Sequence, residues 1–258
     1  MQREPFTTCA IAVMAKAPIP GRSKTRLCPP LSAEQAAVLS AGFHRDMFAN
    51  IAAAARLAPI IGYAAYAPAG TGSAIASLMP PDFGVILADG SVETPADVTG
   101  FGRSLLHAIR GLFARGHPAA CLLNSDSPTL PTAYLAKAAE VLLESGDHIV
   151  LGPAEDGGYY LIGMRAMHAR LFADIPWSSA TVATATRQRA ASLGLAVKEL
   201  PVWYDVDDAS SLRRLRAEIE AGAGGGANIF PADATRAALR QCGASGPPAH
   251  RILNPIAE

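Results

Sequence analysis

The 258-residue sequence is poor in several features that would indicate a particular class of protein. It has only four cysteines (Cys9, Cys28, Cys121 and Cys242), with no CxxC pair among them. Such spacing excludes the usual zinc motifs and a disulfide framework, and it favours a reducing, cytoplasmic environment. Lys and Arg number 22, as do Asp and Glu, so the formal net charge is zero. Because no global basic field exists, we expect no nucleic-acid partner.

Long hydrophobic runs and the best-known ligand motifs are lacking as well. The apolar stretch Cys9–Ala15 is too short for a signal peptide or a transmembrane helix, so we expect no membrane partner and interpret it as a first buried strand. Neither a GxxxxGK[ST] loop nor a GxGxxG loop occurs, and the six histidines form no HExxH pair. Any nucleotide or metal site must therefore use other residues.

What the sequence does contain is an alternation of short apolar segments with longer segments of helical periodicity. The predicted strands are Ala10–Met14, Ile60–Tyr66, Gly84–Leu87, Ala119–Leu123, His148–Leu151, Tyr159–Met164 and Ala196–Leu200. The predicted helices are Ser32–Leu57, Thr71–Met79, Gly102–Ala114, Thr132–Glu144, His168–Phe172, Ala180–Leu193 and a last one from near Asp208. This order predicts an α/β fold with helices on both faces of a parallel or mixed sheet. Ser32 and Gln35 have the spacing of a capping box.

The composition changes at Ala221, where Gly, Ala and Pro become frequent. We therefore assign residues 1–220 to the main domain and residues 221–258 to an extension that we expect to be partly flexible and outside the core.

Ligands of such sheets bind beyond the carboxyl ends of the strands, and the first loop there is rich in cations. Residues 16–27 follow the first strand and read KAPIPGRSKTRL. Exposed backbone N–H groups and several cations are suited to a phosphate. A solvated basic surface loop is the alternative. The candidate phosphate ligands are Lys16, Gly21, Arg22, Lys24 and Arg26.

Three acidic segments belong to the same edge. Asp126 directly follows an apolar strand, where its carboxylate could hold Mg²⁺ or Mn²⁺; the alternative is a turn or helix cap. Asp205 and Asp207 are two apart in an extended segment and share a face, which suits a metal or, alternatively, a capping cluster. We expect Asp208 to cap the last helix.

The third segment, residues 152–160, reads GPAEDGGYY. Its Asp-Gly-Gly sequence is compatible with a plain hairpin turn. Alternatively, its glycines allow close approach of a ligand. In that case Glu155, Gly157, Gly158 and Tyr159 would bind an acceptor, and Asp156 would act on it.

Taken together, the segments MAKAPIPGRSKTRL, NSDSPTLP, GPAEDGGYYLIG, IPWSS and VWYDVDD resemble a family of small bacterial proteins labelled DUF2064. That family is assigned to the GT-A-like nucleotide-diphospho-sugar transferase superfamily. The likeness extends over about residues 9 to 220, and a more distant one is to phospholactate and molybdenum-cofactor guanylyltransferases. The resemblance implies a Rossmann-like, three-layer α/β/α sandwich with a mixed, mostly parallel sheet and a divalent metal, Mg²⁺ or Mn²⁺.

The resemblance also implies roles for matching residues. Asp126 matches a metal-binding aspartate, Asp205 and Asp207 match a later acidic pair, and the basic loop is expected to meet phosphates. Lys24, Asp126 and Asp156 are the residues expected to serve catalysis. The segment Ala88–Arg103 departs from the family's pattern. Only its end, GFGR, keeps the glycine-rich character, and Arg103 is a further candidate for phosphate binding.

Three functions follow as hypotheses. The first is metal-dependent glycosyl transfer from a nucleotide sugar to a small-molecule acceptor. The second is nucleotidyl transfer, in which a nucleoside monophosphate passes from a triphosphate to a phosphorylated small acid. The third is nucleotide binding without catalysis. Base, sugar, acceptor and oligomeric state stay open.

Overall fold

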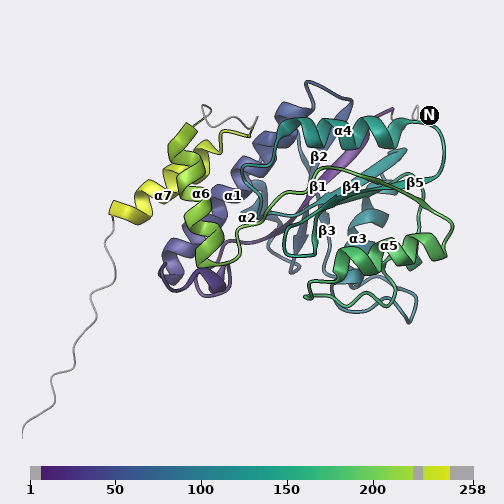
Figure 1. The fold of residues 1–258 in the computed structure, drawn as a ribbon, viewed down its shortest axis with the longest axis horizontal. Coiled ribbons are helices and arrows are strands. Elements are labelled where there is room, and N and C mark those ends of the chain that lie inside the picture. Colours follow the sequence, from purple (N-terminus) through teal and green to yellow (C-terminus); the bar gives the residue numbers. More distant parts are fainter. Residues whose placement is uncertain (1–6, 223–228, 245–258) are drawn as a thin grey trace, which may run out of the picture.

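The structure is a computed structural model that describes residues 7–222 and 229–244 (Figure 1). In this part of the chain, seven strands form one sheet in the order β3-β2-β1-β4-β6-β5-β7. β6 is antiparallel to both of its neighbours, whereas the other neighbouring pairs are parallel. The predicted mixed, mostly parallel sheet is confirmed. The strands are β1 (Cys9–Lys16), β2 (Ile60–Ala67), β3 (Gly84–Leu87), β4 (Ala119–Leu123), β5 (His148–Pro153), β6 (Tyr159–Met164) and β7 (Ala196–Glu199).

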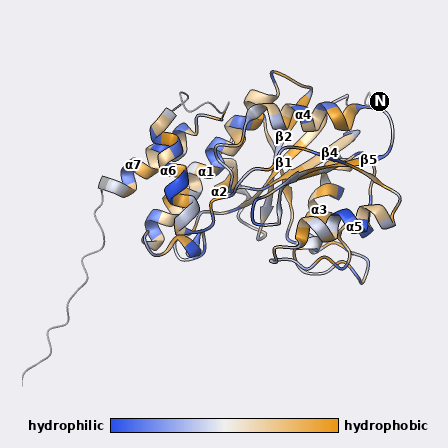
Figure 2. Cartoon of the chain, in the orientation of Figure 1, coloured by the Kyte–Doolittle hydropathy of each residue, from blue (hydrophilic) through white to orange (hydrophobic). Residues whose placement is uncertain are grey.

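Helices cover both faces of the sheet, because successive side chains of each strand point to opposite sides. Ile11 and Val13 of β1 face one core, which is covered by α1 (Ala33–Ala54) and α4 (Thr132–Leu143). Intervening alanines of β1 face a second core, which is covered by α3 (Phe101–Phe113). Figure 2 shows the apolar strands between these helical layers. The expected α/β/α sandwich is therefore present.

The remaining helices are shorter, and several boundaries differ from the prediction. α5 (Val182–Ser192) packs on the α3 side, whereas α2 (Gly72–Ala76) ends well before Pro80. The predicted helix at 168–172 is one turn of 3₁₀ helix, η2 (Ala169–Phe172). The predicted capping box is confirmed, since Ser32 and Gln35 bond reciprocally at the start of α1. None of the described helices combines the length and apolarity that a membrane crossing needs.

The expectation of an extension outside the core is wrong for residues 229–244. They include α7 (Asp233–Ala244), which packs against α1 and helps to bury a third cluster with α6 (Ala209–Ala221). The physical reason is a tertiary cap: the buried carboxylate of Asp46 in α1 accepts hydrogen bonds from the backbone N–H groups of Ala234 (3.0 Å) and Thr235 (2.6 Å). Residues 223–228 and 245–258 of the predicted extension lie outside the described residues.

The site is placed by the point at which the strand order reverses. From β1 the chain adds β2 and β3 on one side, and then returns to place β4 on the other side. A crevice forms at such a switch point, beyond the carboxyl ends of the strands. The loops that follow β1 and β4 border it, and these are the predicted basic loop and the Asp126 loop.

Candidate functional site

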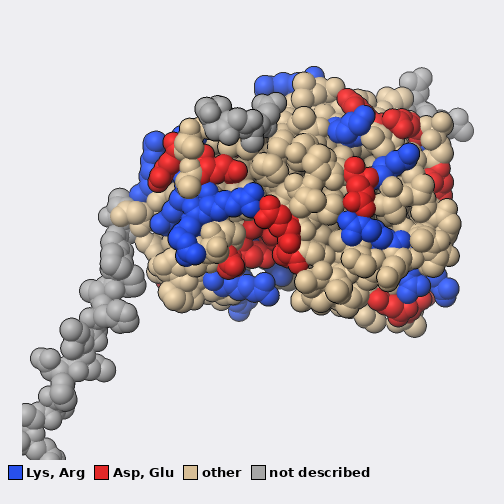
Figure 3. All heavy atoms as spheres, viewed as in Figure 1, with Lys and Arg blue, Asp and Glu red and all other residues tan. Residues whose placement is uncertain are grey.

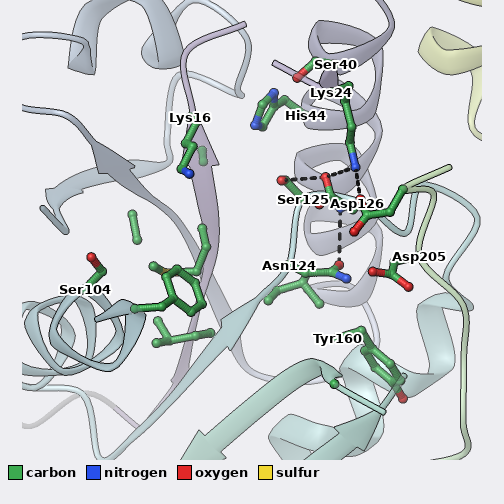
Figure 4. Close-up of a pocket in the computed structure, with 18 of the residues that line it drawn as sticks. Lys16, Lys24, Ser40, His44, Ser104, Asn124, Ser125, Asp126, Tyr160 and Asp205 are labelled. Carbon is green, nitrogen blue, oxygen red and sulfur yellow. Dashed lines mark hydrogen bonds and ion pairs between the residues drawn. The ribbon is translucent and has the colours of Figure 1, made fainter. Parts of the chain in front are cut away.

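A cavity of about 530 Å³ opens at this edge of the sheet (Figure 4). Its wall combines the loops after β1 and β4, the β5–β6 loop, the segment before α6, and one face each of α1 and α3. Most of the predicted site residues line it: Lys16, Arg22, Lys24, Arg26, Asp126, Asp156, Gly158, Tyr159, Asp205 and Asp207. Four others do not: Gly21, Arg103, Glu155 and Gly157.

Hydrogen bonds between its own residues fix the conformation of the basic loop. Buried Ser23 accepts a hydrogen bond from the N–H of Ile19 and donates one to the Ala17 carbonyl, while the N–H groups of Arg22 and Ser23 both donate to the Ile19 carbonyl. These three N–H groups are therefore engaged inside the loop and are not free to bind a phosphate. Lys16 and Arg22 are exposed cations, and neither forms an ion pair with another described residue. They remain available to an anionic ligand.

The structure corrects the expected role of Lys24. Its ammonium lies 2.8 Å from Asp126 Oδ1 and 2.8 Å from Asp207 Oδ1, and it donates to the Val206 carbonyl at 2.7 Å. Burial acts to lower the pKa of Lys24, but the two carboxylates outweigh burial and raise it. With its side chain only 9% exposed, Lys24 is an internal ion-pair partner and not part of an open phosphate site.

Asp126 is held by neighbours on its own loop. Asn124 Oδ1 accepts a hydrogen bond from the N–H of Asp126, and Ser125 Oγ donates to Asp126 Oδ1 at 3.0 Å. Thus Asn124, not Asp126, forms the local turn, and the turn-forming interpretation of Asp126 is wrong. Burial acts to raise the pKa of Asp126, but the Lys24 ammonium outweighs burial and lowers it. Asp126 is therefore a half-buried, ionised carboxylate at the crevice, with 29% of its side chain exposed.

The segment before α6 runs alongside this loop, because the N–H of Val206 donates to the Asp126 carbonyl and Ser127 Oγ donates to the Tyr204 carbonyl. Asp205 and Asp207 thereby reach the cavity, whereas Asp208 caps α6 as predicted. Burial, together with repulsion from the carboxylates of Asp156, Asp207 and Asp126, raises the pKa of Asp205 to about 7. Unlike Asp126 and Asp207, Asp205 forms no ion pair with a described residue. Figure 3 shows acidic side chains gathered beside a hollow next to α6.

This arrangement fits a divalent cation at one place and not at another. Between Asp126 and Asp207 the ammonium of Lys24 already supplies a positive charge. Near Asp205, repelling carboxylates present oxygen ligands of the kind that Mg²⁺ and Mn²⁺ prefer. Within residues 7–222 and 229–244, no three His, Cys, Asp or Glu side chains stand ready-made around one metal position. Binding a metal would therefore require the carboxylates to turn towards one another.

The β5–β6 loop combines a turn with a cavity wall. Asp156 Oδ1 accepts from the Gly158 N–H at 2.8 Å, so the expected hairpin turn is present, and Asp156 also lines the cavity. Gly157 has φ +89°, and a Cβ there would lie 1.9 Å from the Ala180 carbonyl oxygen. Gly157 therefore allows close packing against Ala180, and its predicted contact with an acceptor stays a prediction. Glu155 points elsewhere and pairs with Arg214 at 2.7 Å.

Arg103 also differs from expectation. Its guanidinium donates to the carbonyls of Gly90 and Val92 and to Thr94 Oγ1, so it braces the loop between β3 and α3. Most of its donors are used within the protein, and Arg103 does not line the cavity, so its predicted phosphate contact stays a prediction without support from this geometry.

Sequence reasoning missed the apolar end of the cavity and part of its α1 wall. Phe101, with 45% of its surface exposed, lines the cavity and packs edge-to-face on Trp177 with ring centroids 5.7 Å apart. Ala65, Ala67 and Ala88 supply a small-residue floor. On α1, Ser40 and His44 line the opposite end (Figure 4). The i, i+4 spacing of these two polar residues in an apolar helix was the available signal.

His44 is 2% exposed, and neither ring nitrogen has a hydrogen-bond partner among the described residues. Burial lowers the pKa of His44 to about 4, although Asp126 and the nearby Ser40 carbonyl, which lies outside hydrogen-bond geometry, favour the charged form. The imidazole is therefore neutral at pH 7.

Comparisons with known proteins concern the family and the fold of this chain. Residues 51–179 match the model of a family described as an uncharacterized protein conserved in bacteria, DUF2064. A provisionally assigned nucleotide-diphospho-sugar transferase from Desulfovibrio desulfuricans G20 has a similar structure, with a TM-score of 0.74 and 29% identity over 92% of this chain and 95% of that chain.

A second solved structure is similar in fold alone. CMP:2-keto-3-deoxy-manno-octonic acid synthetase, in complex with CTP, aligns with a TM-score of 0.50 and 10% identity over 81% of this chain and 97% of that chain. Among curated proteins, none matches this chain in sequence.

Proposed function

Because this chain belongs to the DUF2064 family and shares most of its structure with a nucleotide-diphospho-sugar transferase-like protein, we propose that it is a transferase that binds a nucleotide sugar in the cavity. The observation that carries the proposal is the combination of groups in the cavity wall. The wall contains the exposed ring of Phe101, the cations Lys16 and Arg22, which have no ion-pair partner among the described residues, and the carboxylates around Asp205.

These groups are complementary to the parts of a nucleotide. A nucleobase fits the apolar end, where the exposed ring of Phe101 offers a stacking surface. The phosphates then lie against Lys16 and Arg22, which bind them by charge-assisted hydrogen bonds. A divalent ion held by Asp205 and Asp126 would neutralise negative charge on the departing nucleoside diphosphate. Asp156, at the rim, would orient the acceptor hydroxyl.

One observation favours glycosyl over nucleotidyl transfer. The basic loop resembles a triphosphate site only while Lys24 is counted among its free cations. Since all three donors of Lys24 are engaged, Lys16, Arg22 and Arg26 remain. Arg26 also lies 3.9 Å from Asp207. Such a set suits a diphosphate better than a triphosphate.

Isothermal titration of nucleoside diphosphates, nucleotide sugars and nucleoside triphosphates, each with and without Mn²⁺, tests the proposal. We expect a nucleotide sugar to bind more tightly than any triphosphate, and only with Mn²⁺. We also expect Asp205→Asn to reduce the gain in nucleotide-sugar affinity that Mn²⁺ provides. The control Asp147→Asn, at an exposed ion pair with His168, should leave that gain unchanged. Tightest binding of a triphosphate would support nucleotidyl transfer instead. Binding that is the same without metal, or no binding at all, would contradict the proposal.

A further inference from the structure

The ammonium group of Lys24 lies where the side chains of Asp126 and Asp207 meet (Figure 4). A lysine ammonium has three hydrogen-bond donors and no acceptor. Here the three have three acceptors: Asp126 Oδ1 and Asp207 Oδ1 at 2.8 Å each, and the Val206 carbonyl at 2.7 Å. Lys24 therefore has no donor left for a ligand while these contacts persist.

The backbone conformation of Lys24 is also specific to this arrangement. Lys24 adopts a left-handed conformation, with φ 49° and ψ 40°, directly before the 3₁₀ turn η1 (Thr25–Leu27). A non-glycine residue in that region costs on the order of 1–3 kcal/mol and persists only where its surroundings enforce it. The partners come from segments about 100 and 180 residues away in the chain. They hold Lys24 in the wall of the cavity, and Lys24 in turn holds them together.

The carboxylates around Lys24 differ in whether a cation compensates them. Lys24 compensates Asp126 and Asp207, whose contacts with it both use Oδ1, whereas Asp205, in the same cavity wall, forms no ion pair with a described residue. A divalent ion placed between Asp126 and Asp207 would meet the ammonium at close range and be repelled. An ion beside Asp205 would not.

We propose that Lys24 is a built-in cation that takes the place of a divalent ion between Asp126 and Asp207 and positions both carboxylates, so that the cavity holds at most one divalent ion, beside Asp205. Lys24 is thus a positioning residue and not a phosphate ligand. The inference rests on the proposed function only for the ion beside Asp205.

Counting bound Mn²⁺ by electron paramagnetic resonance tests the proposal directly. The wild-type chain should bind at most one Mn²⁺, and Lys24→Gln should bind one more. Mn²⁺ should also raise the unfolding temperature of Lys24→Gln more than that of the wild type, because it restores the lost positive charge. Arg26→Gln is the matched control, since Arg26 is exposed and 3.9 Å from Asp207, and it should keep the wild-type count.

The outcomes separate this inference from the proposed function. One Mn²⁺ in both the wild type and Lys24→Gln would overturn the inference and leave the proposed function standing. No Mn²⁺ in the wild type but one in Lys24→Gln would support the inference and contradict the metal part of the proposed function. Two Mn²⁺ in the wild type would overturn the inference.

Lys24→Gln leaves Asp126 without its partner and can fail to fold. The double variant Lys24→Gln, Asp207→Asn removes one charge of each sign and keeps Asp126 and Asp205. If Lys24 repels the ion, this variant should bind a single Mn²⁺ at least roughly tenfold more tightly than the wild type. Weaker binding would mean that Lys24 supports the metal site, and the proposal would be wrong.

Discussion

Phe101 is unusual as a single residue, because an aromatic ring that is 45% exposed lies in the wall of a cavity and not on open surface. Stacking of a base on an aromatic ring is worth about 1–3 kcal/mol. We expect Phe101→Ala to weaken the binding of a nucleoside diphosphate roughly fivefold or more, and to leave the binding of inorganic pyrophosphate unchanged. Titration calorimetry measures both. Leu57→Ala, at an exposed leucine outside the cavity, is the control. An equal loss for both ligands would mean that Phe101 does not meet the base.

His44 illustrates the cost of a buried polar group at the same scale. Its two ring nitrogens have no partner among the described residues, and leaving such groups unsatisfied costs about 1–3 kcal/mol. Leucine has a similar volume and no polar atom. We therefore expect His44→Leu to raise the free energy of unfolding at pH 7.5 by about 1 kcal/mol, measured by urea denaturation. A loss of stability would show that the imidazole is satisfied by groups such as water.

At the scale of elements, the sequence predicts most strands and helices because each carries a local signal. The capping box at Ser32 and the cap at Asp208 need only residues three positions apart. The partners of Lys24 could not be predicted in this way. Asp207 is 183 residues away, and only the folded sheet brings the two together. The same holds for Arg103, which has the side chain of a phosphate ligand but is used to brace a loop.

α7 depends on α1 for its start, and this gives a prediction for the element. Asp46 accepts both N–H bonds from residues 234 and 235, and α7 has little apolar surface of its own to bury. Asp46→Ala should cost about 1–2 kcal/mol, the scale of a lost helix cap. Hydrogen exchange should show faster exchange at residues 233–244, with β1 and β4 protected as before. Unchanged exchange in α7 would mean that its packing on α1 suffices without the cap.

For the whole molecule the formal charge is zero, but charged side chains of both signs gather in the wall of one cavity: the cations Lys16, Arg22, Lys24 and Arg26 and the carboxylates Asp126, Asp156, Asp205 and Asp207. Two groups of the cavity wall, the half-buried Asp205 and the buried His44, have pKa values that are shifted in opposite directions. The folded state raises the pKa of Asp205 from 3.8 to about 7 and lowers the pKa of His44 from 6.5 to about 4. Between about pH 4.5 and 6.5, folding therefore takes up a proton at Asp205 and releases one at His44.

The signs of the two contributions follow from linkage. Asp205 binds more protons in the folded state, so its contribution to stability is complete below pH 3.8 and is lost as the pH rises to about 7. His44 binds fewer, so its contribution is complete above pH 6.5 and is lost as the pH falls towards 4. In the wild type the two contributions change the free energy of unfolding in opposite directions as the pH changes, so they offset each other. When the pH falls from 6.5 to 5, the free energy of unfolding of Asp205→Asn should therefore fall by more than that of the wild type. The free energy of unfolding of His44→Leu should fall by less than that of the wild type, or should rise.

Urea denaturation of the three proteins at pH 5, 5.75 and 6.5, in buffer with a chelator, measures these slopes. The chelator matters because a divalent ion would hold Asp205 ionised at every pH and remove its contribution. Asp147→Asn, at an exposed carboxylate, should keep the wild-type slope and controls for a general effect of removing negative charge. Parallel slopes for Asp205→Asn and His44→Leu would contradict the opposed titrations. Opposite slopes would support the opposed pKa shifts of Asp205 and His44, two titrating groups of the cavity wall.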